Sequence, residues 1–337
     1  MIDILIFFIG ASLLLYVLLG GSDYGAGILE LLPCGALREK RKHVINEAMG
    51  PVWEANHIWL ILVVVILFNG FPRIFTTLMT ALHAPMLALL AGIVVRGAVF
   101  TFRHHDAVQT GGSQRVYTLL FGCSSLWSAF WLGIIVASLN RGLIDPAAPD
   151  AHAAYIAPWA GLYPLALGLF AACIFLFLAG IYLIGETDDG ALRRHFTRVA
   201  AAANVLVVAS GGLVFAASTL EHESLPALFL RTPAALAALG LATLLCIALW
   251  AAARARRARH ALVTRVIAGG QVTLILLGWW LLYAPNAMLT AAGPLNLYAE
   301  AAPPATLRQL VAALLVGSLF IFPSLFFLLR VFKTRGK

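Results

Sequence analysis

The segment GPVWEANHIWL, residues 50–60, places polar and ionisable side chains at the start of an otherwise apolar stretch. Glu54 and His57 are three residues apart, so on a helix they share one face. Both side chains can accept and donate a proton, as a proton-transfer chain requires, whereas an arginine cannot. Ionisable residues at membrane depth are costly and are therefore functional candidates. If this stretch spans a membrane, it predicts a proton-handling site at one end of the span.

The composition is that of a membrane protein. Of the 337 residues, 61% are hydrophobic and 11% are charged, and the mean hydropathy is +0.92, whereas soluble proteins contain about 25% charged residues. No polar stretch is long enough for a soluble domain, so residues 1–337 are predicted to form a single membrane domain. The N-terminus lacks the basic region and cleavage site of a signal peptide, so the first helix is expected to be retained. The cysteines show no CxxC spacing and predict neither a metal site nor a disulfide framework: Cys34, Cys123, Cys173 and Cys246.

Apolar runs of about 20 residues match the thickness of a bilayer core, roughly 30 Å. Nine such runs predict an all-α polytopic membrane protein with nine transmembrane helices. The predicted helices lie near residues 2–22, 52–71, 75–102, 115–138, 159–185, 195–217, 232–253, 262–284 and 307–332. Residues 36–49 mix apolar and charged side chains, which predicts an interfacial helix that ends at Gly50-Pro51.

Lysine and arginine are divided unequally between the two ends of these spans. The first, third, fifth and seventh connections and the C-terminal tail carry 18 of them, the other side carries four, and Arg96 lies within a span. Short loops rich in these residues stay cytoplasmic, so we expect a periplasmic N-terminus and a cytoplasmic C-terminus. The net charge of +8 is therefore a consequence of topology, and no nucleic-acid partner is predicted.

Four ionisable residues are expected in one layer near the cytoplasmic surface. The predicted end of the first span places Asp23 at that depth, and the second span begins there with Glu54 and His57. Arg96 lies about 9 Å before the end of the third span, at about 1.5 Å per residue. Either Arg96 neutralises Glu54 or Asp23 and fixes helix packing, or the carboxylates pass protons inward from the cytoplasm. The two interpretations are compatible, because a carboxylate in a relay still needs a charge partner.

His57 and His83 raise the question of haem binding. Ligation by two histidines requires both at one depth on facing helices, but these two differ in depth by about 10 Å at 1.5 Å per residue. We therefore expect hydrogen-bonded interior histidines and no haem or other cofactor bound by this chain alone. Trp53 and Trp59 flank the polar cluster, whereas the other tryptophans are expected to pack or to lie in interfacial belts.

The ordered motifs resemble those of subunit II of the cytochrome bd-type quinol oxidases. GGSDYGAG is similar to the family's GFDxGxG segment, with Asp23 on its aspartate. PVWEANHIWLI is similar to PxWDGNxxWLI, which places Glu54 on the acidic position, Asn56 on the asparagine and Trp59 on the second tryptophan. VRGAVFTFR resembles FRxxxFxxR, with Arg96 on the first arginine. The similarity in order and spacing is good over the first 105 residues and weak beyond about residue 200.

This resemblance implies a complex that takes electrons from quinol and reduces O2 to water. In that family subunit I holds two b-type haems, haem d and the quinol site. Subunit II is expected to fold as two four-helix bundles plus one peripheral helix and to pair with subunit I in the bacterial inner membrane. The resemblance does not decide whether small single-helix accessory subunits are present, or whether a structural quinone or lipid lies between the helices.

The resemblance also assigns expected roles to residues. Glu54 is the proton carrier in a path that includes Asp23, His57 and Arg96, and Trp59 lies near an oxygen route. The neighbouring Trp53 and Asn56 are grouped with Trp59 as oxygen-route or packing residues. The sequence departs from the family pattern in three places: Glu54 replaces an aspartate, Ala55 a glycine and Ser22 a phenylalanine.

Two other classes of protein remain as alternatives. A proton-coupled secondary transporter should show discontinuous helices or inverted repeats, and the sequence shows no clear internal symmetry. A quinone-binding anchor of another membrane reductase would be recognised by a copurifying iron–sulfur or molybdenum subunit.

Overall fold

The computed structural model describes residues 1–337 except for residues 51–52, 106–110, 146, 222–224, 255–260 and 335–337. Within these described residues, nine helices are long and apolar enough to cross a membrane. The prediction of an all-α polytopic membrane protein with nine spans is therefore confirmed. The predicted start of the second span at Val52, the predicted helix end at Gly50-Pro51 and the seventh connection fall wholly or partly outside the described residues.

The first span is longer than predicted. It consists of α1 (Ile2–Leu15), a π-helical turn η1 (Tyr16–Gly20) and α2 (Gly21–Leu31). The prediction that it ends near residue 22 is wrong, because its glycines serve close packing and do not terminate the helix. At Gly25 a Cβ atom would overlap the backbone carbonyl of Phe175 on the neighbouring helix. The helix ends instead at Leu31, because the next residue, Leu32, precedes a proline and is extended.

The second and third spans follow an interfacial segment. The 3-10 turn η2 (Gly35–Leu37) and α3 (Arg38–Met49) occupy the region predicted as an interfacial helix, and α4 (Trp53–Gly70) is the second span.

The predicted helix over 75–102 is wrong as a single element. It is divided at Leu82 into α5 (Pro72–Ala81) and α6 (His83–His105). The short helix α5 buries Ile74, Leu78 and Ala81, a spacing that places one apolar stripe against the protein.

The remaining spans agree with the predicted ones to within a few residues. They are α7 (Gly111–Ser138), α9 (Leu162–Leu183), α10 (Gly190–Leu220), α12 (Pro233–Arg254), α13 (Ala261–Tyr283) and α14 (Pro304–Thr334). Two short helices, α8 (Ala151–Tyr155) and α11 (Leu225–Arg231), lie in connections. An antiparallel hairpin of β1 (Asn286–Thr290) and β2 (Gly293–Asn296), which was not predicted, precedes α14.

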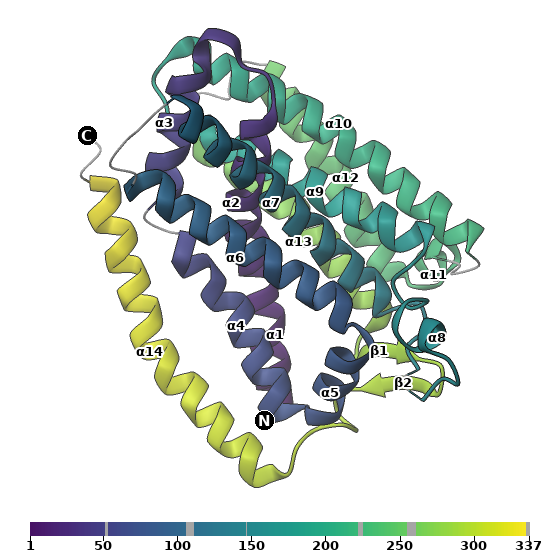
Figure 1. Cartoon of the computed structure of the whole chain (residues 1–337). Helices are drawn as coiled ribbons and strands as arrows, with labels where there is room; N and C mark the ends of the chain where they lie inside the picture. Colours follow the sequence, from purple (N-terminus) through teal and green to yellow (C-terminus); the bar gives the residue numbers. More distant parts are fainter. Residues whose placement is uncertain (51–52, 106–110, 146, 222–224, 255–260, 335–337) are drawn as a thin grey trace.

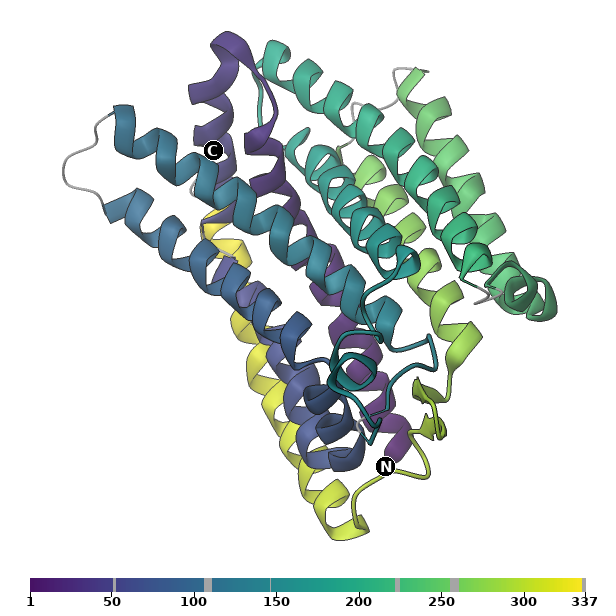
Figure 2. The same ribbon diagram turned by 45° about the vertical axis from the view of Figure 1, so that its right-hand side comes forward.

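Helices α2 and α9 lie at the centre of the arrangement. Helix α2 packs against α7 and α9, whereas α9 also packs against α10 and α13. Helix α4 packs against α1 and α14, and α14 runs along one edge of the molecule (Figure 1). Figure 2 shows α10, α12 and α13 grouped on the opposite side from α4 and α14. The division into two four-helix bundles stays a prediction.

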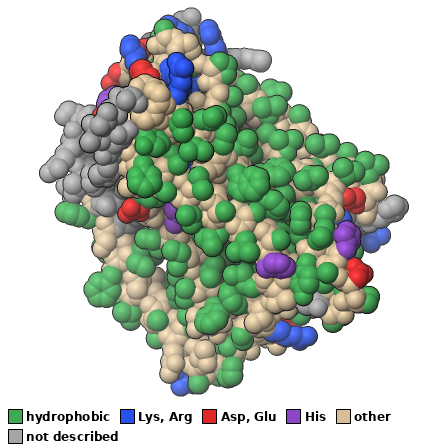
Figure 3. Space-filling model, in the orientation of Figure 1, with side chains coloured by type: hydrophobic (Ala, Val, Ile, Leu, Met, Phe, Trp, Pro, Cys, Tyr) green, Lys and Arg blue, Asp and Glu red, His purple; other side chains and the backbone are tan. Residues whose placement is uncertain are grey.

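The surface is suited to lipid. Hydrophobic side chains cover most of the face in Figure 3, and Lys and Arg gather mainly near its upper end, where α3 lies. The N-terminus, α5 and the β hairpin lie at the other end (Figure 1). The two ends therefore differ as the charge distribution predicts, and their assignment to cytoplasm and periplasm stays a prediction.

Candidate functional site

A buried ion pair joins the first and third spans. Nη2 of Arg96 on α6 lies 2.5 Å from Oδ1 of Asp23 on α2, and both side chains are 1% exposed. Of the two partners that the sequence offered to Arg96, the structure selects Asp23. A buried pair of this kind needs further hydrogen bonds, because neither charge has water to solvate it.

The structure supplies such support to the Arg96 guanidinium. Its Nε donates to Ser125 Oγ at 3.0 Å, and its Nη2 donates to the carbonyl oxygen of Asp23 at 3.3 Å. The rings of Tyr24 and Phe121 also contact the guanidinium, and each ring centroid lies 4.9 Å from the guanidinium carbon. Arg96 is therefore held by charge, hydrogen bonds and cation–π contacts at once.

Next to Asp23, three aromatic side chains continue the polar region toward α4. The hydroxyl groups of Tyr16 and Tyr24 are hydrogen-bonded at 2.8 Å. The His57 ring lies with its centroid 6.2 Å from that of Tyr16 and 6.1 Å from that of Tyr24. Its Nδ1 atom is buried and has no hydrogen-bond partner among the described residues. Groups that can both donate and accept protons thus lie beside the ion pair.

The π-helical turn Tyr16–Gly20 carries Tyr16 of this site. Such turns are frequent at functional sites because they shift the helix register and release a backbone carbonyl. Here the carbonyl of Leu19 accepts from Ser22 Oγ at 2.7 Å and lies 3.5 Å from Asn56 Nδ2. Asn56 is 5% exposed, so this polar contact links α4 to the first span inside the protein.

Glu54 lies apart from the buried pair. Its side chain is exposed on this chain, and among the described residues it has no ion-pair partner. Glu54 therefore does not join the buried Asp23–Arg96 pair in this chain, and its role in the proton path stays a prediction. Glu54 and His57 are about one helical turn apart on α4, but their surroundings differ. The Glu54 side chain is exposed, whereas the His57 ring contacts Tyr16 on the first span.

The tryptophans of the same segment pack in different directions. Trp53 has its ring centroid 5.2 Å from that of Phe100 on α6. Trp59 is 5% exposed, and its ring centroid lies 6.2 Å from that of Phe322 on α14. The indole N–H of Trp59 is buried and unpaired among the described residues.

A second buried ion pair was missed by the sequence analysis. Arg103 on α6 donates to both carboxylate oxygens of Glu30 on α2, at 2.7 and 3.1 Å, and both side chains are 1% exposed. It was missed because the first span was expected to end before Glu30, and because Arg103 was counted as a loop cation.

The second pair could have been predicted from the spacing of its residues. Glu30 follows Asp23 by seven residues, and Arg103 follows Arg96 by seven, which is about two helical turns on both helices. The pairs therefore form two rungs about 10 Å apart between α2 and α6.

The other histidine that was considered as a haem ligand lies elsewhere. The Nδ1 atom of His83 lies 2.9 Å from the carbonyl oxygen of Thr80, and its ring packs on Tyr155, 5.1 Å between centroids. Within the described part of the chain, no group of three or more His, Cys, Asp or Glu side chains is arranged to hold a metal ion.

Comparisons with known proteins identify the family and the fold of this chain. The sequence model of the family described as Cytochrome bd terminal oxidase subunit II matches residues 1–332. Cytochrome bd ubiquinol oxidase subunit 2 of Bacillus subtilis is 26% identical over 185 residues, which are 55% of this chain and 53% of that protein. Cytochrome bd-I ubiquinol oxidase subunit 2 of Escherichia coli K12 is 27% identical over 95 residues, 28% of this chain and 24% of that protein.

The matched segments thus span about half or less of the length of these curated relatives. A chain in the structure of bd oxidase from Geobacillus thermodenitrificans superposes with a TM-score of 0.77 at 19% identity and covers 98% of both chains. At that identity the likeness shows a shared fold along the whole chain.

Proposed function

The chain belongs to the cytochrome bd terminal oxidase subunit II family, and from this we propose that it is the haem-free subunit of a quinol:oxygen oxidoreductase. It pairs with a subunit I that holds two b-type haems and haem d, and the complex reduces O2 to water with electrons from quinol. This chain contributes a proton path from the cytoplasmic side of the bacterial inner membrane. Its N-terminus is periplasmic and its C-terminus cytoplasmic, in accordance with the distribution of Lys and Arg.

The observation that carries the proton path is the polar line inside the first three spans. The buried Asp23–Arg96 pair adjoins the hydrogen-bonded hydroxyls of Tyr16 and Tyr24, and these adjoin His57 with its unpaired Nδ1. Polar groups inside the membrane are costly, so a purely structural helix contact would need only the ion pair. Proton transfer requires groups that accept one proton while they release another. The tyrosine hydroxyls and the His57 imidazole are such groups.

Within this path Arg96 acts as a positioning residue. Its fixed charge holds Asp23 in place and sets the electrostatic potential at the two tyrosines and His57. Glu54 acts at the surface of the chain, where its exposure suits a carboxylate that exchanges protons with the partner subunit. The oxygen route follows the side of α4 on which Trp59 lies, with Asn56 and Trp53 as packing residues around it.

The replacement Glu54→Gln tests the proposal directly. It removes the titratable group while it keeps the size of the side chain, so the complex should assemble and retain its haem content. We expect the rate of quinol oxidation by O2 to fall at least about tenfold, which corresponds to about 1.4 kcal/mol of barrier. Oxygen consumption by the purified complex is the measurement.

Glu47→Gln is the matched control, since Glu47 is also exposed but lies on α3, where it pairs with His43 at 3.3 Å. It should leave turnover unchanged. Normal turnover and normal proton uptake in Glu54→Gln would show that Glu54 carries no protons.

A further inference from the structure

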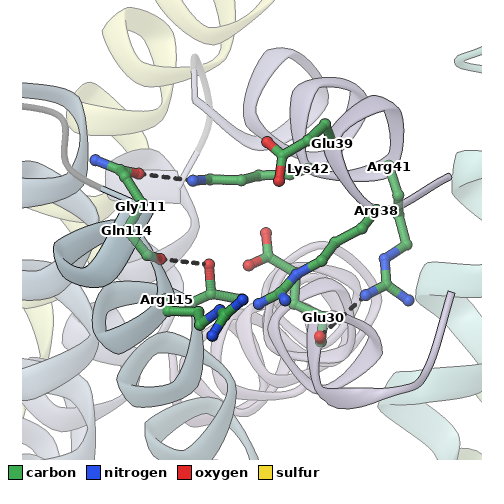
Figure 4. A pocket seen from close by; sticks show the side chains of 9 residues that line it. Glu30, Arg38, Glu39, Arg41, Lys42, Gly111, Gln114 and Arg115 are labelled. Atoms are coloured by element: carbon green, nitrogen blue, oxygen red, sulfur yellow. Dashed lines mark hydrogen bonds between the residues drawn. The ribbon is translucent and has the colours of Figure 1, made fainter. Parts of the chain in front are cut away.

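A cavity of about 380 Å³ lies at the end of the bundle where α2 ends, α3 begins and α7 begins (Figure 4). Its walls include Glu30 on α2, three basic residues on α3, and Gln114 and Arg115 on α7. The basic residues of α3 are Arg38, Arg41 and Lys42. None of these α3 and α7 residues has a role in the proposed proton path.

The charges of the lining do not balance. Four cationic side chains face the cavity, against the carboxylates of Glu30 and Glu39. Glu30 is already engaged by both nitrogens of Arg103, which lies outside the lining. Burial, together with the charges of Arg103 and Arg38, lowers the pKa of the Lys42 ammonium. The cavity therefore carries an excess of positive charge that the described residues leave uncompensated.

The lining also offers hydrogen-bond donors that lack acceptors. Lys42 Nζ donates to Gln114 Oε1 at 2.6 Å, which leaves the Nε2 of Gln114 buried and unpaired among the described residues. Arg41 is 2% exposed and donates to the carbonyl oxygens of Leu32 and Glu30 at 2.9 and 3.0 Å, but its buried Nε has no acceptor there either. These unpaired atoms are all N–H donors, and leaving such donors unpaired is costly. These N–H groups therefore suit a ligand that accepts hydrogen bonds.

Two further cations extend into the cavity from opposite walls. Figure 4 shows Arg38 from α3 and Arg115 from α7 reaching into the space between these helices. Among the described residues, no carboxylate forms an ion pair with either of them. Arginine guanidinium groups suit phosphate, because their planar donors match two phosphate oxygens.

The surface beside the cavity is apolar. Directly after Arg115, α7 exposes Val116, Leu119 and Leu120, with 54%, 58% and 42% of each residue accessible. These residues lie on the membrane-spanning part of α7. A ligand with a phosphate in the cavity could thus lay acyl chains along this face of the helix.

We propose that this cavity binds a phosphate group, supplied by the headgroup of an anionic phospholipid. Basic pockets at the cytoplasmic ends of spanning helices suit such headgroups, and the cavity is larger than a single inorganic phosphate needs. The lipid would join α3 to α7 at a place where no direct ion pair among the described residues does so. The site does not depend on the redox activity proposed above.

The test uses the full chain, purified in mild detergent with the subunits that copurify. The variant Arg38→Gln/Arg115→Gln removes the two unpaired cations, and Arg231→Gln, an exposed arginine at the end of α11, is the control. Arg115→Gln alone is made as well, in case the double variant is unstable. Native mass spectrometry measures retained phosphatidylglycerol, and a thermal-shift titration measures binding of phosphatidylglycerol and of inorganic phosphate.

We expect the double variant to bind phosphatidylglycerol about tenfold more weakly, the single variant to show a smaller loss, and the control to bind normally. Inorganic phosphate should then stabilise the wild type far less than the lipid does. Equal stabilisation by inorganic phosphate, lost in the same variants, would keep the phosphate site but overturn the lipid as its source. Equal binding of both probes in all variants would overturn the site.

Discussion

Arg96 forms the buried ion pair that joins the first and third spans. Among the described residues its charge is paired with the carboxylate of Asp23, and both side chains are 1% exposed. Removing one member of a buried pair leaves the other charge unsolvated, whereas removing both can cost much less. The energetic role of the pair can therefore be separated from its role in proton transfer.

We predict that Arg96→Gln and Asp23→Asn each destabilise the protein by about 3–5 kcal/mol, and that the double variant is less destabilised than the sum of the two. Thermal melting of the detergent-purified protein provides the measurement. Arg73→Gln, which breaks the contact between the exposed Arg73 side chain and Glu300, should have a smaller effect. Additive losses in the double variant would contradict a direct coupling between Asp23 and Arg96.

The residue types of the site could be predicted from the sequence, but not their environments. Asp23, His57 and Arg96 were expected together, and the structure brings them into one region. Glu54 was expected there too and is exposed, because the direction of a side chain depends on how its helix is rotated against its neighbours. Glu30 was missed because the first span was predicted to end nine residues too early, and Arg103 was missed because the third span was predicted to end at residue 102.

At the level of elements, the contact between α2 and α9 depends on a glycine. A Cβ at Gly25 would overlap the carbonyl of Phe175 and lie against Ala179, so α2 can approach α9 this closely only where no side chain intervenes. The same helix that carries Asp23 and Glu30 is thus positioned by backbone contact with α9.

Gly25→Ala is therefore expected to push α2 away from α9, with a loss of stability of about 1–3 kcal/mol or more. Less assembled protein and a lower melting temperature are the expected results. Gly10→Ala in α1 is the control, because a Cβ there meets nothing within 4 Å. Equal behaviour of the two variants would show that the close approach of α2 to α9 is unimportant.

A second link between elements joins α3 to the start of α10. Lys40 Nζ donates to Asp189 Oδ2 at 2.6 Å, and the other oxygen of Asp189 caps α10 by accepting from Ala191 N at 2.8 Å. The Lys40 hydrogen bond and the helix N–H groups lower the pKa of Asp189 to about 2. Since this pKa is depressed in the folded state, the stabilisation is present above the ordinary pKa of an aspartate and is lost as pH falls toward 2.

We predict that Asp189→Asn, which keeps a capping side chain, removes the part of the pH dependence that lies between about pH 4 and pH 2. Melting temperatures of wild type and variant should therefore differ above pH 4 and converge below it. A difference that persists unchanged at pH 2 would contradict the assigned ionisation of Asp189.

For the whole molecule, apolar runs and charge distribution were sufficient to predict nine spans and two unlike ends. The break at Leu82 could not be predicted, because an amphipathic helix followed by a span has the same apolar length as one long span. The β hairpin was also missed, since its two strands have only five and four residues and lie between two spans.

We propose above all that this chain assembles with a haem-bearing partner into one quinol oxidase complex. The most direct measurement is a reduced-minus-oxidised spectrum of the tagged chain purified in mild detergent, with mass spectrometry of the chains that accompany it. We predict b-type haem and chlorin bands together with a copurifying membrane subunit that binds the haems. A stable, colourless and solitary protein would contradict the claim and would favour a transporter instead.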